Sequence, residues 1–300
     1  MNLYSRRTFL GTSAGALTAA ALPRYARALT SGIHYGYAAI TWGAEERQAI
    51  EDIASTGYRG IQFRANALTD FKPAELKQSL AEHKLTFVAL SSGDVLLDAQ
   101  MTDEVAKHAS HAQFVKDAGG LYLQVLDKLE PYPRKVTPDQ CVRLGKLLTE
   151  IGKRTADIGI PMGYHNHLNT ISEHPDNLER VLENSDPKYV KLELDMAHSL
   201  AGGGDPAEAV LKYRDRLLFL HLKDVINIPL NTPGTQYPFK FVELGKGRVD
   251  FPAVFKAINK VGFKGWAVVE LDKVPEAGKT PKQCAIISRD YLTQTIGVKI

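Results

Sequence analysis

The feature that most restricts the possible folds of this chain is an eightfold alternation of short apolar runs with longer amphipathic runs. Runs rich in β-branched and aromatic residues predict strands at 33–42, 58–64, 87–91, 121–126, 162–167, 190–195, 218–223 and 266–271. Helical periodicity predicts helices near 45–56, 73–83, 102–118, 138–158, 175–184, 206–214, 251–261 and 281–294. Strands that are each followed by a helix are expected to pair in parallel, because parallel neighbours need a long crossover connection.

Helix start signals support several of these boundaries. The segments 137–140 and 280–283 each combine a capping threonine, a proline at the first helical position and a glutamine three residues after the threonine. Eight strand–helix units of about 30 residues fit a closed (β/α)₈ TIM barrel. The alternative, a doubly wound sheet, is disfavoured because Gly245-Lys246-Gly247 lacks the third glycine of a dinucleotide-binding turn and follows a long loop. We therefore expect an α/β fold, a single-domain TIM barrel over residues 29–300.

Residues 1–28 have the pattern of a twin-arginine export signal. Arg6 and Arg7 precede an uncharged, weakly apolar run at 9–22, and Ala26-Arg27-Ala28 forms a small-x-small cleavage site. That run is shorter than the roughly 20 residues that a membrane-spanning helix needs. The pattern predicts export to the periplasm, a mature chain that begins at Leu29, and no membrane span after cleavage.

The charge balance bears on possible partners. The whole chain carries a formal net charge of +3, but the first 28 residues contain four arginines and no acid, which leaves the mature chain at −1. The mature chain therefore lacks the excess of positive charge that is typical of proteins that bind nucleic acid or anionic membranes, and neither is expected as a partner. The two cysteines, Cys141 and Cys284, lie far apart in the sequence, and this spacing neither predicts nor excludes a disulfide.

Polar residues follow four successive predicted strands, at the end where a TIM barrel builds its active site. Ordered by strand, they are His165 and His167, then Asp195 with His198, then His221 with Lys223, and finally Glu270. A mixed set of imidazole and carboxylate ligands suits Mn²⁺, Zn²⁺, Co²⁺ or Fe²⁺ better than copper or calcium. The sequence thus predicts one divalent metal at this face of the barrel.

The motifs 163–167, 194–198, 221–224, 244–250 and 269–272 resemble those of the xylose-isomerase-like barrels of sugar phosphate isomerases and epimerases. This family also contains inosose dehydratase, D-tagatose 3-epimerase and endonuclease IV. The resemblance extends from about Gly36 to the C-terminus. It implies a metal held by Asp195, His221 and Glu270, with His198 and Lys223 contacting a carbohydrate substrate.

The fifth strand departs from the epimerase pattern. Epimerases place a glutamate there that is both ligand and acid/base, whereas this chain has His165 in a Tyr-His-x-His sequence similar to that of inosose dehydratase. Because the second carboxylate of the epimerase pair is missing, β-elimination next to a ketone is favoured over epimerisation. Either His165 or His167 can be the fourth ligand, and His167 can instead serve as acid or base or hydrogen-bond a ligand.

The expected function is a metal-dependent carbohydrate lyase or hydratase acting on a keto-sugar or keto-glycoside through an enediolate. Glu270 is the base that the family implies, and His167 or Lys223 is the candidate acid. Arg64 and Trp42, at the ends of the second and first strands, are expected to contact substrate with His198.

Two other functions and one structural question stay open. A keto-sugar isomerase or epimerase using the same metal site is the first alternative, and a non-catalytic periplasmic sugar-binding protein is the second. A trinuclear nuclease is disfavoured because the second and third strands end without histidines. The long segment 226–249, rich in Pro, Asn and Gly, is either a lid over the substrate or a contact in a homo-oligomer.

Replacing both Arg6 and Arg7 by lysine is expected to leave the precursor in the cytoplasm, because the export machinery reads the arginine pair. Cell fractionation followed by N-terminal sequencing of the exported protein measures this, with Leu29 as the expected first residue. Normal periplasmic delivery of the double variant would contradict the prediction.

Overall fold

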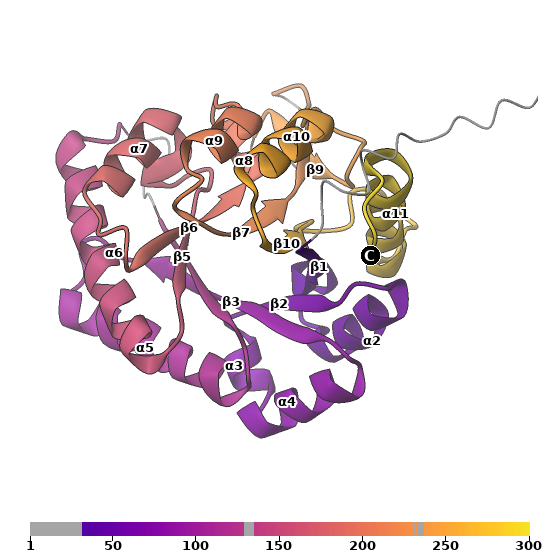
Figure 1. Ribbon diagram of the computed structural model, residues 1–300, viewed down its shortest axis with the longest axis horizontal. Helices are drawn as coiled ribbons and strands as arrows, with labels where there is room; N and C mark the ends of the chain where they lie inside the picture. Colours follow the sequence, from indigo (N-terminus) through magenta and orange to yellow (C-terminus); the bar gives the residue numbers. More distant parts are fainter. Residues whose placement is uncertain (1–31, 129–134, 231, 233–236) are drawn as a thin grey trace, which may run out of the picture.

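The computed structural model describes residues 32–128, 135–230, 232 and 237–300. Eight parallel strands close into a barrel that is surrounded by helices (Figure 1). Their order around the barrel is β1, β10, β7, β6, β5, β4, β3, β2. They are β1 (Ile33–Ala38), β2 (Gly60–Arg64), β3 (Thr86–Val95), β4 (Tyr122–Asp127), β5 (Met162–His165), β6 (Val190–Asp195), β7 (Leu217–Leu222) and β10 (Gly265–Val269). The predicted single-domain TIM barrel is confirmed.

The helices between the strands form the outer layer of the barrel (Figure 1). The longer ones are α2 (Glu46–Thr56), α4 (Pro73–Glu82), α5 (Met101–Asp117), α6 (Pro138–Ile158), α7 (Pro175–Glu183), α9 (Pro206–Lys212), α10 (Phe251–Val261) and α11 (Pro281–Tyr291). Short helical segments are η1 (Ala39–Trp42), α3 (Ala67–Asp70), η2 (Ile171–Glu173), α8 (Met196–Ala201) and the π-helical η3 (Leu292–Ile296). Both predicted capping boxes are present, at Thr137 with Gln140 and at Thr280 with Gln283.

Several strand ends differ from the sequence-based expectation. Strand β1 stops at Ala38 because the chain turns into η1, and β3 continues to Val95. Strand β5 stops at His165, two residues early. There the Asn166 side chain takes over the pairing with β6, because its Nδ2 donates to Asp195 O at 3.2 Å and its Oδ1 accepts from Asp195 N at 2.9 Å. Residues 166 and 167 are therefore free to leave the barrel wall.

Apolar side chains fill the barrel interior below the carboxyl ends of the strands. Ala38, Val88, Phe219, Trp266 and Val268 form a buried cluster there. Gly60 belongs to the same layer, and a Cβ at this position would overlap the Trp266 ring and the Val88 side chain. A second, larger apolar cluster packs the helices against the outside of the strands. The filled interior leaves room for a site only at the carboxyl end of the barrel.

The segment 226–249, expected as an irregular loop, contributes to a two-stranded antiparallel hairpin of β8 (Asp224–Asn227) and β9 (Phe239–Val242). Asp224 fixes the base of this hairpin. Its Oδ1 accepts from Val225 N and Val249 N at 2.9 and 3.1 Å, and its Oδ2 accepts from Gly245 N and Gly247 N at 3.0 and 2.9 Å. Burial raises the pKa of Asp224, while the backbone donors act in the opposite direction.

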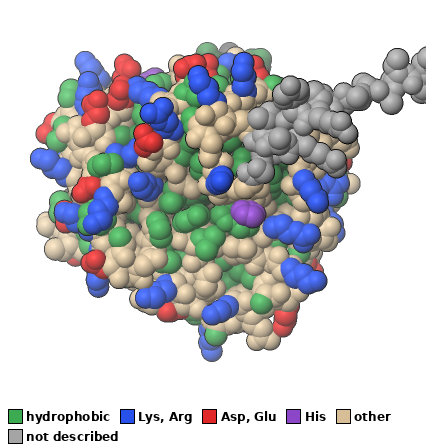
Figure 2. Space-filling model, viewed as in Figure 1, with side chains coloured by type: hydrophobic (Ala, Val, Ile, Leu, Met, Phe, Trp, Pro, Cys, Tyr) green, Lys and Arg blue, Asp and Glu red, His purple; other side chains and the backbone are tan. Residues whose placement is uncertain are grey.

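The surface, the search for membrane-spanning helices and the cysteines complete the description of the fold. In Figure 2, hydrophobic side chains gather near the centre of the face, and Lys, Arg, Asp and Glu are spread around its rim. No helix in the described part of the chain is long and apolar enough to cross a bilayer. Both cysteines are free and buried. The predicted export signal lies outside the described residues.

Asp224→Ala is expected to lower the free energy of unfolding by about 3 kcal/mol or more, because four backbone N–H groups lose a charged acceptor. Asp224→Asn, which keeps one side-chain acceptor oxygen, should lose less. Urea unfolding measures both values, and limited proteolysis should show earlier cleavage within 224–249 in the Ala variant. Equal stability of the Ala variant and the parent protein would contradict this role.

Candidate active site

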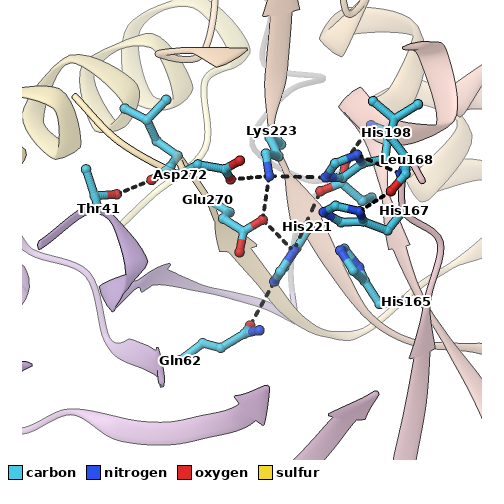
Figure 3. A network of polar contacts seen from close by, with 12 residues as sticks. Thr41, Gln62, His165, His167, Leu168, His198, His221, Lys223, Glu270 and Asp272 are labelled. Atoms are coloured by element: carbon cyan, nitrogen blue, oxygen red, sulfur yellow. Dashed lines mark hydrogen bonds and ion pairs between the residues drawn. The ribbon is translucent and has the colours of Figure 1, made fainter. Parts of the chain in front are cut away.

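Four side chains from adjacent strands converge at the carboxyl end of the barrel, and we call them the ligand cluster. They are His165 from β5, Asp195 from β6, His221 from β7 and Glu270, which comes directly after β10. The side chains meet because neighbouring strands end at the same level of the barrel. Asp195 of β6 pairs with His221 of β7, and Glu270 N donates to Leu222 O of β7 at 3.0 Å. Figure 3 shows His165, His221 and Glu270 pointing toward one another.

His221 lies at the centre of the carboxylates. Its Nδ1 is 3.6 Å from Asp195 Oδ2 and 3.3 Å from Glu270 Oε2. Its Nε2 contacts a carboxylate oxygen of Glu193 and lies 2.8 Å from Gln62 Oε1. Side chains of His221, Asp195 and Glu193 are fully buried. So many carboxylate oxygens around one buried imidazole call for a compensating positive charge.

The ligand cluster fits a divalent metal ion. His165 Nδ1, Asp195 Oδ2 and His221 Nδ1 are buried and have no hydrogen-bond partner among the described residues. Ligand atoms of three members of the cluster, His165, Asp195 and Glu270, lie within 4.8 Å of one another and of a ligand atom of His198, whereas His221 forms such a group with His165 and Glu193. Buried polar atoms are costly without partners, and a cation would satisfy these together. Imidazole and carboxylate donors suit Mn²⁺, Co²⁺, Zn²⁺ or Fe²⁺.

The same charges set the protonation of His221 and Glu270. Burial alone would lower the pKa of His221, but Glu193 and Glu270 outweigh it and hold this pKa well above its usual value. Burial also opposes ionisation of Glu270, yet Lys223 and His221 hold the pKa of Glu270 well below its usual range. The proton on His221 thus supplies, without metal, the positive charge that the carboxylates require.

Lys223 links the ligand cluster to Asp272. Its Nζ donates to Glu270 Oε2 at 2.9 Å and to Asp272 Oδ1 at 2.5 Å, and it lies 3.2 Å from His198 Nε2 (Figure 3). Nζ is also 4.2 Å from the centre of the Phe241 ring. Burial would lower the pKa of Lys223, but Asp272 and Glu270 raise it above its usual value. Lys223 therefore remains a cation that orients Glu270.

The two histidines of the fifth strand differ in their surroundings. His165 is 2% exposed and belongs to each group of side chains in the described residues that could hold a metal. His167 is half-buried, its Nδ1 donates to Leu168 O at 2.6 Å, and its ring centre is 3.7 Å from that of His198. A neutral imidazole that donates through Nδ1 has an unprotonated Nε2. His165 is thus the better ligand, and His167 is left as a proton acceptor.

Asp127 at the end of β4 holds the segment that carries His167. Its Oδ1 accepts from Tyr164 OH at 2.5 Å and its Oδ2 accepts from Ile171 N at 2.8 Å. Burial raises the pKa of Asp127 to about 6, against the effect of both donors. These bonds fix the two sides of the turn after β5.

The sequence interpretation missed two buried polar residues below the ligand cluster. Glu193 Oε2 lies 3.7 Å from His165 Nδ1, and Gln62 contacts His221. Burial raises the pKa of Glu193 to about 7, while His221 lowers it. The signal for Glu193 is its position two residues before Asp195 in an apolar strand, because strand alternation points both side chains into the barrel.

A cavity of about 130 Å³ opens beside the ligand cluster, and Arg64 is the predicted substrate-binding residue that lines it. His167, Lys223 and Glu270 also line it, together with Asp272. His198 lines an adjoining cavity instead. Trp42 lines neither cavity. The indole of Trp42 is 7% exposed, lies edge-on to Tyr37 and donates from Nε1 to Asp52 Oδ2 at 2.9 Å. Since β1 ends at Ala38, the turn η1 carries Trp42 into the core instead.

Comparison with known proteins assigns the family. The family model described as xylose isomerase-like TIM barrel matches residues 50–290, and the chain belongs to this family. An inosose dehydratase from Lacticaseibacillus casei is 25% identical over 296 residues, with 89% of this chain and 98% of the relative covered. The family resemblance predicted from the motifs is confirmed.

Solved structures of low sequence identity share the fold. The probable 3-DHS dehydratase AsbF from Bacillus anthracis has a TM-score of 0.71 at 16% identity, with 87% of this chain and 98% of that chain covered. The IOLI protein, solved with a bound zinc atom, has a TM-score of 0.73 at 18% identity, with 88% and 98% covered. The barrel architecture is thus independently supported.

The purified mature protein is expected to bind about one divalent transition metal per chain, because the ligand cluster completes one site. Asp195→Asn should lose most of the bound metal while keeping the α8 cap, since Asp195 Oδ1 accepts from His198 N at 2.7 Å. Elemental analysis after dialysis measures the metal, and circular dichroism checks the fold. The matched control Asp205→Asn changes the cap of α9, outside the ligand cluster, and should retain the metal. Full metal retention in Asp195→Asn would show that the ligand set is wrong.

Proposed function

We propose that this chain is a metal-dependent keto-sugar dehydratase, which eliminates water or another β-oxygen substituent next to a ketone, or adds it in the reverse direction. The relative named inosose dehydratase and the structural neighbour named 3-DHS dehydratase support this reaction class. The observation that carries the proposal is His167, whose ring lines the cavity with Nδ1 bonded to Leu168 O. This arrangement leaves Nε2 as a base at the cavity.

The metal and the base have separate tasks. A divalent cation held by the ligand cluster would polarise the substrate ketone and make the neighbouring C–H bond more acidic. We assign this proton to His167 instead of Glu270, the base that the family resemblance implied, because Glu270 is a member of the ligand cluster. Burial and Lys223 lower the pKa of His167 and keep its ring neutral. Lys223 holds Glu270 in place and adds positive charge near the ketone oxygen.

One imidazole suffices for elimination. His167 Nε2 takes the proton from the carbon next to the ketone, the carbon–carbon double bond forms, and the bond from the β-carbon to its oxygen breaks. The proton on Nε2 then passes to the departing oxygen, so the products are an enone and water or an alcohol, and His167 returns to its neutral form. Epimerisation would instead need a second acid on the opposite face, and His165 stands where epimerases keep a glutamate.

The proposal also covers the cellular location of the protein, the periplasm, and the chemical class of its substrate. A periplasmic address favours keto-sugars, keto-polyols and keto-glycosides, because phosphorylated intermediates belong mainly to the cytoplasm. The cavity supplies one cationic lysine, already paired with Asp272 and Glu270, and the half-buried Arg64. A neutral oxidised sugar fits this arrangement better than a phosphate ester.

The deciding experiment incubates metal-loaded protein with keto-cyclitols and oxidised glycosides in deuterated buffer, with products identified by NMR. Elimination should release water or an aglycone and yield an enone. Conversion of intact keto-sugars between epimers, with solvent deuterium on carbon, would favour the epimerase alternative instead. Binding without any turnover would favour the sugar-binding alternative.

His167→Gln is expected to lower kcat by about 10² to 10⁴ while the metal content is unchanged, because it removes a proton acceptor but no ligand. Glu270→Gln should lower both metal content and kcat, which separates the two residues. His165→Glu restores an epimerase-like carboxylate, and deuterium incorporation without elimination is the expected gain. Unchanged kcat in His167→Gln would overturn the assignment of the base.

A further inference from the structure

A second and larger cavity adjoins the ligand cluster. Its volume is about 740 Å³, and the hairpin β8–β9 and residues 272–275 form much of its wall. His167 and Asp272 line both this cavity and the smaller one, so the two cavities are neighbours at these side chains. The apolar part of the lining consists of Leu168, Ile226, Ile228, Tyr237, Phe239, Phe241, Val274 and Pro275.

A row of aromatic rings leads from the ligand cluster into this cavity. The His198 ring lies 5.0 Å from Phe241, Phe241 lies 5.6 Å from Phe239, and Phe239 stacks on Tyr237 at 5.2 Å with an angle of 10°. Phe239 and Phe241 are two residues apart in β9, so their side chains point to the same side of the strand, and Tyr237 lies just before it. Phe239 and Phe241 are only half-buried, although apolar strand faces are normally covered.

The two cavities differ in size and chemistry. The smaller one has charged and amide side chains and a volume of about 130 Å³, below the roughly 300 to 1,000 Å³ that is usual for ligand pockets. The larger one lies within that range and is mainly apolar. A free keto-sugar, polar on every face, would leave the aromatic row uncovered.

Asn169 adds a polar group to the wall of the larger cavity. Its backbone has a left-handed φ of 63°, which non-glycine residues adopt at a cost. Its Nδ2 donates to Tyr237 OH at 2.5 Å, and its Oδ1 is buried without a hydrogen-bond partner among the described residues. Because Asn169 lines the cavity and carries an acceptor without a partner, it suits a ligand that combines a flat ring with a hydroxyl donor.

We propose that the larger cavity is a subsite for a planar phenolic aglycone, so that the substrate is a keto-glycoside whose sugar occupies the smaller cavity. This inference rests on the proposed function for the reaction at the sugar. The aromatic row stacks against the aglycone ring, and Asn169 Oδ1 accepts from its hydroxyl. The leaving group of the elimination is then the aglycone oxygen, which takes the proton from His167 and departs as a phenol.

The test measures binding separately from turnover. Isothermal titration of the metal-loaded mature protein compares three unoxidised probes: methyl, phenyl and 4-hydroxyphenyl β-glucoside. The phenyl glucoside should bind at least about tenfold more tightly than the methyl glucoside. Phe239→Ala should weaken phenyl binding by about threefold to tenfold and leave methyl binding unchanged. Asn169→Ala should remove the additional affinity of the 4-hydroxyphenyl glucoside.

A matched control is Phe263→Ala, which truncates another half-buried phenylalanine that does not line the cavity. It should leave the binding of all three probes unchanged. Equal binding of methyl and phenyl glucosides, or equal effects of the two phenylalanine variants, would overturn the subsite. A change of oligomeric state in Phe239→Ala with unchanged phenyl binding would overturn it in favour of an interface between copies of the chain.

The outcomes also distinguish the subsite from the proposed function. If the protein eliminates from keto-sugars but shows no preference for aryl glycosides, the proposed function stands and the subsite is wrong. Phe239-dependent binding of aryl glucosides without turnover of any oxidised glycoside keeps the subsite and rejects the proposed function.

Discussion

The active-site end of this barrel depends on one electrostatic constraint, the burial of several carboxylates around a single imidazole. Glu193, Asp195 and Glu270 surround His221 at the carboxyl end of the barrel, where neither water nor distance screens their charges. Such a cluster is stable only with a cation in it, whether a proton on His221, the ammonium of Lys223 or a metal ion. The same requirement underlies the proposed chemistry, because a cation that satisfies the carboxylates would also attract electrons from a ketone bound beside it.

Hydrogen bonds around the ligand cluster determine where the two histidines of the fifth strand lie. Asn166 ends β5 by pairing its side chain with the backbone of Asp195, and Asp127 holds the turn after the strand. As a result His165 stays in the barrel layer, whereas His167 moves out to the cavity wall with its Nδ1 tied to Leu168 O. Two histidines separated by one residue therefore lie in different surroundings, which is the basis for proposing one as ligand and the other as base.

The hairpin β8–β9 extends the site beyond the barrel. Asp224 binds backbone N–H groups at both ends of this insertion, so the aromatic row on β9 is held at a fixed distance from the ligand cluster. Phe241 connects the two parts, because its ring contacts both Lys223 and His198. The barrel thus supplies the polar lining of the smaller cavity, and the insertion supplies aromatic side chains to the larger one.

The barrel and most of the ligand cluster could be predicted from the amino-acid sequence, because both depend on the repeat of apolar and polar residues within short segments. Alternation in strands and start signals in helices are written in consecutive residues, and parallel strands bring His165, Asp195, His221 and Glu270 to one end. The departure from the epimerase pattern at His165 was equally visible in the sequence. Contacts between distant segments had no such signal. The folded chain was needed to show that η1 carries Trp42 into the core, that Glu193 and Gln62 lie beneath His221, and that β8 and β9 pair beside the site. Each of these depends on where a turn ends or on which distant side chain fills a space, and local propensity does not contain that information.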